Sequence, residues 1–401
     1  MMKCTQIAGL IFLLLAGNTL SCLANEAIIA PETPRFRAVT IDAKVEIGYG
    51  VAVSDVDGDG RQDILLADKN LIVWYRNPNW EKHVIAEKLT ALDHVCIAAT
   101  DVNGDGKAEV AAGAGWNPSD TTGSGSVHYL MAPEDRTRLW EARTLPHEPT
   151  VHRMRWIRDE AGKYQLVVVP LHGRGNQNGQ GAGVRILSYQ MPAEPRGDWK
   201  TELIDDTLHM THNFDVVQWD ADAAQELLVA AKEGIFLFDK GPEKWQRTQL
   251  AGGADLPGAG EIRVGKLPGG RRFIATIEPM HGNMMALYTA PDANENGVHS
   301  LWRRRVLADD LREGHALGCG DFLGLGYDQI VVGWRGKNAE GKTGIRLYKP
   351  LDNKGEQWRQ MTIDDNIACE DLTLADLNGD KKLDIIASGR ATKNLIVYFG
   401  E

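Results

Sequence analysis

Histidines occupy recurrent places in this chain. Four come where a short apolar run begins, and two more come in polar connections between such runs. They are His94, His152, His212 and His315, and then His172 and His281. A neutral imidazole can bind zinc or a similar transition metal, and it can also serve as a general base. The six side chains therefore indicate a metal centre, or a metal-free site with histidine as the base, if the fold brings them together.

Further polar residues occupy equivalent connections. They are Tyr49, Glu261, Glu370, Arg335 and Arg390, and Trp334 directly precedes Arg335. The two glutamates could supply additional metal ligands. In a metal-free site, arginine or tyrosine would stabilise the charge that develops during the reaction. The sequence contains no HExxH or CxxC pattern, so the metal hypothesis depends on the fold.

Three acidic loops share a second pattern. Their oxygen-bearing side chains fall at positions 1, 3, 5 and 9, as in a calcium-binding loop. They are Asp55, Asp57, Asp59 and Asp63; Asp101, Asn103, Asp105 and Glu109; and Asp376, Asn378, Asp380 and Asp384. The first two loops have glycine at position 6, where the chain must turn sharply, and the third has Lys381. The spacing predicts structural calcium ions, and the alternative is that the carboxylates cap tight turns without metal.

Tryptophan marks the repeating unit that would position these residues. Six times a tryptophan is followed five residues later by Leu or Ile, at intervals of 46 to 60 residues. The pairs are Trp80/Ile85, Trp140/Leu145, Trp199/Ile204, Trp245/Leu250, Trp302/Leu307 and Trp358/Ile363. A local unit that recurs in this way predicts a repeat fold. Phe36 and Ile41 copy the spacing before the first unit, whereas no such strand follows the last one.

Each unit contains four short strands. In the first unit they are predicted at 51–54, 63–67, 71–75 and 80–85, separated by Gly, Asn, Pro and Asp, which are turn residues. The seven units begin near Gly48, His94, Val151, Thr211, Gly258, Gly314 and Ala368. We therefore expect an all-β protein, a single seven-bladed β-propeller over residues 36–401, closed by its N-terminal strand. The histidines would then face one side of the ring and the acidic loops the other.

The first 24 residues read as a secretory signal peptide. Lys3 precedes a short apolar run, Ile7–Leu15, and small residues precede a cleavage position after Ala24. Lipid attachment at Cys22 is the alternative. Either reading predicts export to the periplasm or the cell exterior, and no other segment is long and apolar enough to span a membrane.

The net charge and the number of cysteines argue against nucleic-acid binding and against a disulfide-stabilised fold. The net charge of −11 argues against binding to nucleic acid, which needs a basic face. After cleavage three cysteines would remain, Cys96, Cys319 and Cys369, and an odd, sparse set does not form a disulfide framework. The sequence does not indicate an oligomeric state.

The acidic loops carry a first resemblance. An Asp-x-Asp-x-Asp-Gly loop followed by a short apolar strand resembles the FG-GAP/VCBS repeat of integrin heads and of many exported bacterial proteins. The resemblance covers essentially the whole mature chain and implies a propeller. It does not imply one activity, because this repeat hosts many functions.

The histidine segments carry a second resemblance. The runs around His172, His212, His281, His315 and Glu370 are similar to the propeller domain of the aldos-2-ulose dehydratase family. That family has a zinc ion at the base of the propeller cleft and dehydrates 2-keto sugars such as 1,5-anhydrofructose. Its cupin domains perform a later isomerisation. Because the seven units use all of this chain, the resemblance implies the dehydration step alone.

These observations predict the elimination of water beside the ketone of a small sugar or glycan. The metal ligands are expected among His94, His152, His212 and His315. The catalytic candidates are His172, His281 and Tyr49, and the substrate-binding candidates are Arg335, Arg390, Trp334, Glu261 and Glu370. Packing between blades is the alternative for Trp334.

Two other function classes remain open. A polysaccharide lyase acting on acidic glycans would use Arg335 and Arg390 to neutralise a uronate carboxylate. A non-catalytic, calcium-stabilised binding propeller would have scattered histidines and no cluster.

Overall fold

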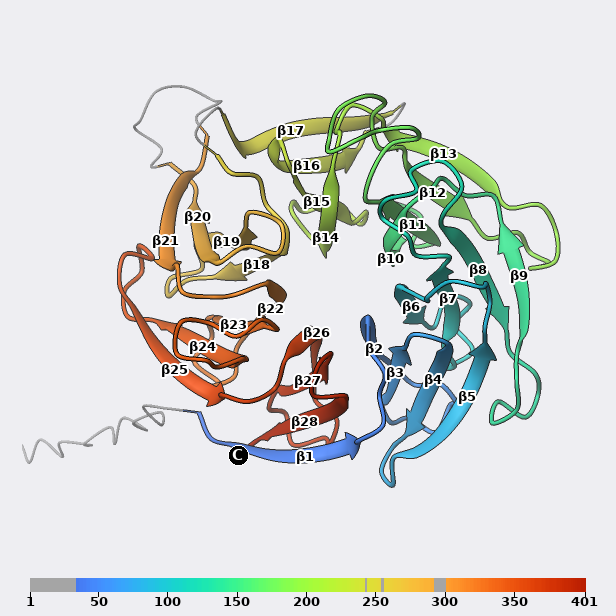
Figure 1. The fold of residues 1–401 in the computed structure, drawn as a ribbon, viewed down its shortest axis with the longest axis horizontal. Coiled ribbons are helices and arrows are strands. Elements are labelled where there is room, and N and C mark those ends of the chain that lie inside the picture. Colours follow the sequence, from blue (N-terminus) through green and yellow to red (C-terminus); the bar gives the residue numbers. More distant parts are fainter. Residues whose placement is uncertain (1–33, 242–243, 254–255, 292–300) are drawn as a thin grey trace, which may run out of the picture.

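The protein is an all-β ring. The computed structural model describes residues 34–241, 244–253, 256–291 and 301–401. Within these residues every regular element is a strand, and 28 strands form seven four-stranded antiparallel sheets. The sheets surround a central axis as blades (Figure 1). The prediction of a seven-bladed β-propeller is confirmed. No helix in this part of the chain has the length and apolar character needed to cross a bilayer. The predicted signal peptide lies outside the described residues.

The strands follow one another in regular order from blade to blade. The first three blades are β2 (Gly50–Ser54), β3 (Asp63–Ala67), β4 (Leu71–Arg76) and β5 (Glu81–Glu87); β6 (Cys96–Thr100), β7 (Glu109–Ala114), β8 (Ser126–Met131) and β9 (Glu141–Leu145); and β10 (Val151–Arg158), β11 (Tyr164–Pro170), β12 (Ile186–Gln190) and β13 (Lys200–Asp205). The next three are β14 (Thr211–Val217), β15 (Glu226–Ala231), β16 (Gly234–Lys240) and β17 (Trp245–Gly252); β18 (Ile262–Lys266), β19 (Arg272–Glu278), β20 (Met284–Thr289) and β21 (Arg303–Ala308); and β22 (Gly314–Gly320), β23 (Gln329–Trp334), β24 (Gly344–Pro350) and β25 (Trp358–Asp364). The seventh blade combines β26 (Cys369–Ala375), β27 (Asp384–Gly389) and β28 (Asn394–Gly400) with β1 (Phe36–Asp42).

The hydrophobic core lies between neighbouring blades. The second and third strands bury both faces, as in β3, where every residue is buried. Leu65 and Trp74 of the first blade, for example, pack with Val110 and Ala112 of the second. The outermost strands, such as β5, expose several side chains. Each sheet is covered on one face by the preceding blade and on the other by the following blade. Its β-branched runs can therefore be short and continuously apolar.

The N-terminal strand closes the ring. Strand β1 pairs with β28 in antiparallel register from Phe36 opposite Gly400 to Asp42 opposite Leu395. Val39 and Ile41 pack on a core cluster that joins the seventh blade to the first. The strand order and the contact of β1 with β28 therefore agree with the closure predicted from the Phe36/Ile41 spacing (Figure 1).

Removal of the chain through Ala43 tests this closure. The truncation deletes β1, exposes the edge of β28 and uncovers the core cluster shared with the first blade. We expect the melting temperature, followed by circular dichroism, to fall by roughly 5–10 °C.

A matched truncation that begins at Arg35 keeps β1 and provides the control. It should melt within about 1 °C of the full chain, because surface changes cost little stability. Equal melting temperatures for the two truncations would show that β1 does not stabilise the ring.

Candidate metal centre

Three histidines from three blades meet beside the ring axis. They are His212 on β14, His281 in the loop after β19, and His315 on β22. One ring nitrogen from each lies within 4.8 Å of the others. The Nε2 atoms of His212 and His281 are 2.8 Å apart, and the ring centroids of His281 and His315 are 4.7 Å apart. We call this group the histidine triad. Its members come from different blades, so only the closed ring can assemble it.

Local irregularities of the first strands direct these side chains. The first strands β14 and β22 each have one more residue than the second strand they pair with, which forms a β-bulge. The bulges lie between Thr211 and Phe214 and between Gly314 and Ala316, and they contain His212 and His315. Equivalent breaks enclose His152 and Glu370. A bulge leaves a residue out of the ladder and redirects its side chain, and bulges are common next to functional sites. The first strands of blades one, two and five pair without such a break.

Hydrogen-bond partners select the ring nitrogens that face the centre of the triad. Nδ1 of His315 donates to the backbone oxygen of Glu370, at 2.5 Å. Nδ1 of His212 lies 3.1 Å from Oε1 of Glu261, a carboxylate only 1% exposed. The proton on Nδ1 of His315 leaves a lone pair on its Nε2, and the carboxylate beside Nδ1 of His212 favours the same tautomer for that ring. Such partners orient histidines that bind metals and raise their basicity.

Burial keeps the imidazoles neutral. It lowers the pKa of His212, and it lowers the pKa of His315 well below the usual value with help from the positive charge of Arg335. Burial, then His212 and Arg335, lower the pKa of His281 to about 2. Burial alone would raise the pKa of Glu261, but contact with His212 and the charge of Arg153 outweigh it and lower the pKa to about 2. The site thus combines three neutral imidazoles with one ionised carboxylate, which fits a transition metal such as zinc.

Two of the predicted histidine ligands are placed differently. His152 is next to His212, with ring centroids 4.6 Å apart, but Nδ1 donates to the backbone of His212 and Nε2 accepts from Arg153. Both ring nitrogens are occupied, so His152 supports the triad and is not free to act as a ligand. His94 is fully buried in another place, where Nε2 accepts from the backbone of Leu89. The structure therefore does not bring His94 into the triad, contrary to the expectation that it is one of the ligands.

The two histidines predicted as acid and base take separate positions. His281 belongs to the triad and also lines a depression of about 880 Å³, together with Arg312 and Glu313. His172 is half-buried, and its backbone is fixed by the hydroxyl of Thr150. Among the described residues, no hydrogen bond, ion pair or ring contact joins His172 to the triad. Its catalytic role therefore stays a prediction.

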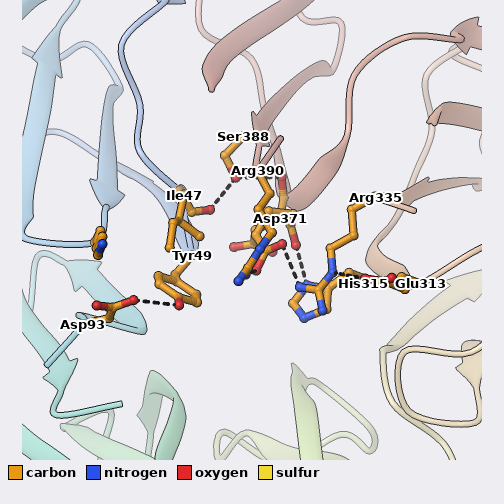
Figure 2. A network of polar contacts seen from close by, with 12 residues as sticks. Ile47, Tyr49, Asp93, Glu313, His315, Arg335, Asp371, Ser388 and Arg390 are labelled. Carbon is orange, nitrogen blue, oxygen red and sulfur yellow. Dashed lines mark hydrogen bonds and ion pairs between the residues drawn. The ribbon is translucent and has the colours of Figure 1, made fainter. Parts of the chain in front are cut away.

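A polar network extends from the triad along the mouth of the ring. Glu370, which is 1% exposed, binds Arg335 through Oε2 at 2.7 Å and Arg390 through Oε1 at 2.9 Å. The guanidinium group of Arg390 lies over the ring of Tyr49, and Tyr49 donates to Asp93 at 2.9 Å. Figure 2 shows Tyr49 with Asp93 on one side of Arg390, and His315 with Arg335 on the other.

The charges of this network are largely balanced. Glu370 lies between the two arginines, and Glu313 forms a second ion pair with Arg335, at 3.2 Å. Burial and the hydrogen bond to Asp93 raise the pKa of Tyr49, so its hydroxyl keeps its proton. The network can therefore offer hydrogen-bond donors to a neutral, hydroxyl-rich ligand.

Trp334 does not face this mouth. Its side chain is 2% exposed, it packs in the core with Val332 and Tyr348, and its Nε1 donates to the backbone of Lys342. The prediction that it stacks on a sugar ring is wrong, and the alternative of packing between blades is correct.

The acidic loops join first to second strands. In the first loop, carboxylate oxygens of Asp55, Asp57 and Asp59 lie within 4.8 Å of one another. Asp63 at position 9 is fully buried and accepts from the backbone of Val56 and Asn77, so it caps the turn instead of facing the other oxygens. Glu109 and Asp384 hold backbone groups in the same way. Position 9 thus caps the turn in all three loops, and its predicted role as a calcium ligand stays a prediction.

The structure also places together residues that sequence spacing does not connect. Asp239 on β16 joins Asp220, Asp222 and Glu226 in an acidic group on the fourth blade. Asp93, before the first strand of the second blade, accepts a hydrogen bond from Tyr49, before the first strand of the first blade. Sequence spacing does not reveal these two contacts, because Asp239 and Asp93 meet their partners from a different strand or a different blade.

Comparison with known proteins agrees with this geometry. Residues 124–291 match the family model of the aldos-2-ulose dehydratase β-propeller domain. Residues 55–112 and 97–130 match models of FG-GAP-like and FG-GAP repeats. Aldos-2-ulose dehydratase of Phanerodontia chrysosporium is 26% identical over 267 residues, an alignment that covers 60% of this chain and 29% of that protein.

Solved structures show the same fold at low sequence identity. BBS1N in complex with ARL6DN has a TM-score of 0.53 and 15% identity, with 91% of this chain and 95% of that chain covered. The Cps50 (Swd1) propeller domain of Myceliophteria thermophila has a TM-score of 0.52 and 8% identity, with 90% and 99% covered. At these identities the likeness concerns the fold alone. The chain is thus a seven-bladed β-propeller with FG-GAP-like repeats, and its middle part is similar to the propeller domain of aldos-2-ulose dehydratase.

Proposed function

We propose that this protein is a metal-dependent lyase that eliminates water from a keto sugar such as 1,5-anhydrofructose. The observation that carries the proposal is the histidine triad, in which three imidazoles from three blades turn ring nitrogens toward one point. His212 and His281 fall inside the segment that matches the dehydratase propeller, and His315 follows it. Three protein ligands leave one position of a tetrahedral zinc site open for substrate.

The chain's own residues divide the reaction among them. A zinc ion held by His212, His281 and His315 would polarise the sugar carbonyl and acidify the neighbouring C–H group. The backbone of Glu370 holds the proton on Nδ1 of His315, and the carboxylate of Glu261 beside Nδ1 of His212 would favour the same metal-binding tautomer there. Burial lowers the pKa of His172, so this imidazole is unprotonated and can accept the α-proton.

The remaining groups serve the substrate and the leaving group. The protonated hydroxyl of Tyr49 is a candidate to protonate the departing hydroxyl, which then leaves as water while the C–H electrons form the double bond. Arg335 and Arg390, held by Glu370, would donate hydrogen bonds to sugar hydroxyls.

The charge balance favours a neutral sugar over an acidic glycan. A uronate carboxylate needs an arginine that is free to neutralise it, yet Arg335 and Arg390 both already bind Glu370. The convergence of the triad also weighs against the non-catalytic alternative, which predicts scattered histidines.

A direct assay tests the activity. Metal-replete protein is mixed with 1,5-anhydrofructose, and the absorbance of a conjugated enone is followed. We expect the enone to appear with wild-type protein and not with protein stripped of metal. Protein with one bound ion and no enone would favour the binding-module alternative.

Single alanine substitutions at His212 and His315 test the ligand set. Each should lower the metal content from about one ion to below roughly a tenth. Enone formation should fall roughly 10³-fold, since metal assistance supplies several kcal/mol. His209→Ala is the matched control, because His209 is 41% exposed and pairs with Glu233 outside the triad. Full metal content in the two triad variants would contradict the assignment.

Glu261→Gln tests the carboxylate behind His212. The substitution keeps the shape of the side chain but removes the negative charge that orients the ring. Competition with a chelator should show a metal affinity about 10- to 100-fold weaker. Glu233→Gln, which changes the equivalent partner of the exposed His209, should leave the affinity unchanged. Equal effects of the two variants would exclude an orienting role for Glu261.

Calcium remains our proposal for the first acidic loop, where Asp55, Asp57 and Asp59 converge. Added calcium should raise the melting temperature and EGTA should reverse the shift, because binding to the folded state stabilises by about 2.7 kcal/mol at 100-fold excess over Kd. Asp57→Asn should abolish most of this shift. Asp365→Asn, which changes an exposed carboxylate paired with Lys342 outside the loops, should preserve it. A shift absent from wild-type protein would leave the loops as metal-free turns.

A further inference from the structure

A second polar site lies on the axis of the ring. A cavity of about 630 Å³ is lined by the first strands of six blades, β2, β6, β10, β14, β18 and β26. These strands are the innermost elements around the centre (Figure 1). None of the triad histidines lines this cavity. It is therefore distinct from the candidate metal centre.

The charge of the cavity wall is opposite to that of the protein. Four arginines line it, Arg153, Arg155, Arg158 and Arg263, against two aspartates, Asp215 and Asp371. The chain as a whole carries a net charge of −11. Positive side chains gathered in an enclosed space focus a positive potential there, and such a field attracts small anions.

Three of the four arginines of the wall have no carboxylate partner among the described residues. In the described parts of the chain, no carboxylate oxygen lies within 4.0 Å of Arg155, Arg158 or Arg263. Arg155 donates to the amide oxygen of Asn213 at 3.1 Å, and Arg263 donates to a backbone oxygen. The two aspartates instead accept from backbone nitrogens, those of Val264 and Val51. The positive charges of the wall are thus left without direct ion pairs.

Arg153, the fourth, is only partly compensated in a more buried place. Its side chain is 5% exposed, and Nη2 has no hydrogen-bond partner. The nearest carboxylate, Glu261, is 4.0 Å away and is already bound to Asn213 and close to His212. A buried donor without a partner costs free energy that a bound acceptor would recover.

The electrostatic environment of Arg155 agrees with this geometry. Burial and then the neighbouring Arg263 lower the pKa of Arg155 to about 10, although Asp215 and Asp371 act in the opposite direction. A neutral sugar would not relieve this repulsion between like charges. An oxyanion would, because a guanidinium group matches carboxylate and phosphate with two parallel hydrogen bonds.

We propose that the axial cavity binds a small molecule with a carboxylate or phosphate group, held by Arg153, Arg155 and Arg263. The cavity shares Tyr49 with the polar network of the mouth. Arg153 links it to the triad through the hydrogen bond to His152, and Asn213 links Arg155 to Glu261. Arg155 and Arg263, the residues changed in the test, have no part in the proposed lyase reaction.

Calorimetric titration tests the cavity with two anions, inorganic phosphate and gluconate, in a chloride buffer without other oxyanions. We expect saturable binding of at least one anion to wild-type protein, and the tighter of the two identifies the preferred group. Arg155→Gln and Arg263→Gln should each weaken binding at least 10-fold. Arg359→Gln is the matched control, because it removes an exposed positive charge from the outer strand β25. This variant should bind the anion as tightly as wild-type protein does.

Two further measurements separate binding from folding and from the metal centre. Without anion, Arg155→Gln and Arg263→Gln should melt at or above the wild-type temperature, because each removes one of two repelling charges. A lower melting temperature would assign these arginines a structural role. The His315→Ala variant should still bind the anion. If this variant loses anion binding, the anion binds at the triad and not in the axial cavity. No saturable binding of either anion, or equal weakening by Arg359→Gln, would overturn the proposal.

Discussion

The pairing of β1 with β28 is the contact on which the arrangement of the other blades depends. Each blade packs on two neighbours, and a strand from the opposite end of the sequence completes the seventh. Closure leaves no open edge at this point and fixes seven first strands around one axis. Because residues from distant parts of the sequence meet only at that axis, the candidate metal centre, the mouth network and the axial cavity all follow from this one constraint.

Inside the ring, burial decides the chemistry of the side chains. The imidazoles of the triad stay neutral because the protein interior disfavours their charged form, and a neutral imidazole is the form that binds a metal. The same burial would favour a neutral Glu261, but the neighbouring His212 and Arg153 keep it ionised. In the neighbouring axial cavity, Arg155 and Arg263 have no ion pair with a carboxylate of the described residues, and each lies on the wall that the other lines. The axis therefore carries two adjacent environments, one suited to a cation and the other to an anion.

The sequence predicts the fold in detail because the fold is built from local, repeated patterns. The tryptophan spacing locates the outer strands, and the short apolar runs locate the inner ones, since both reflect packing that each blade repeats. The face that bears His212, His281 and His315 also follows from strand order alone. The outcome for Trp334 does not, because an aromatic residue at a strand end can face either solvent or the next blade.

The choice among the histidines depends on geometry that the sequence does not display. His94, His152, His212 and His315 look alike as residues near the start of a strand, but only the last three lie in bulges. Of these, His152 is occupied at both nitrogens by neighbours from its own blade and the next. A bulge shifts the register by one residue without a distinctive composition, so its position could not be read from residue types. The partners of the acidic side chains, such as Val56 for Asp63, are hidden because the same residue spacing serves either a capped turn or a calcium loop.

The register of the closing strand has a mechanical consequence. Phe36 lies opposite Gly400, so the chain enters and leaves the β1–β28 ladder at the same end. A force that pulls the two ends apart would load the hydrogen bonds one pair at a time, beginning at Phe36 and Gly400, because the bonds of an antiparallel pair run across the strands. The ring would then unzip along its seam at low force, whereas a pull on two neighbouring blades would have to shear a whole packed face at once.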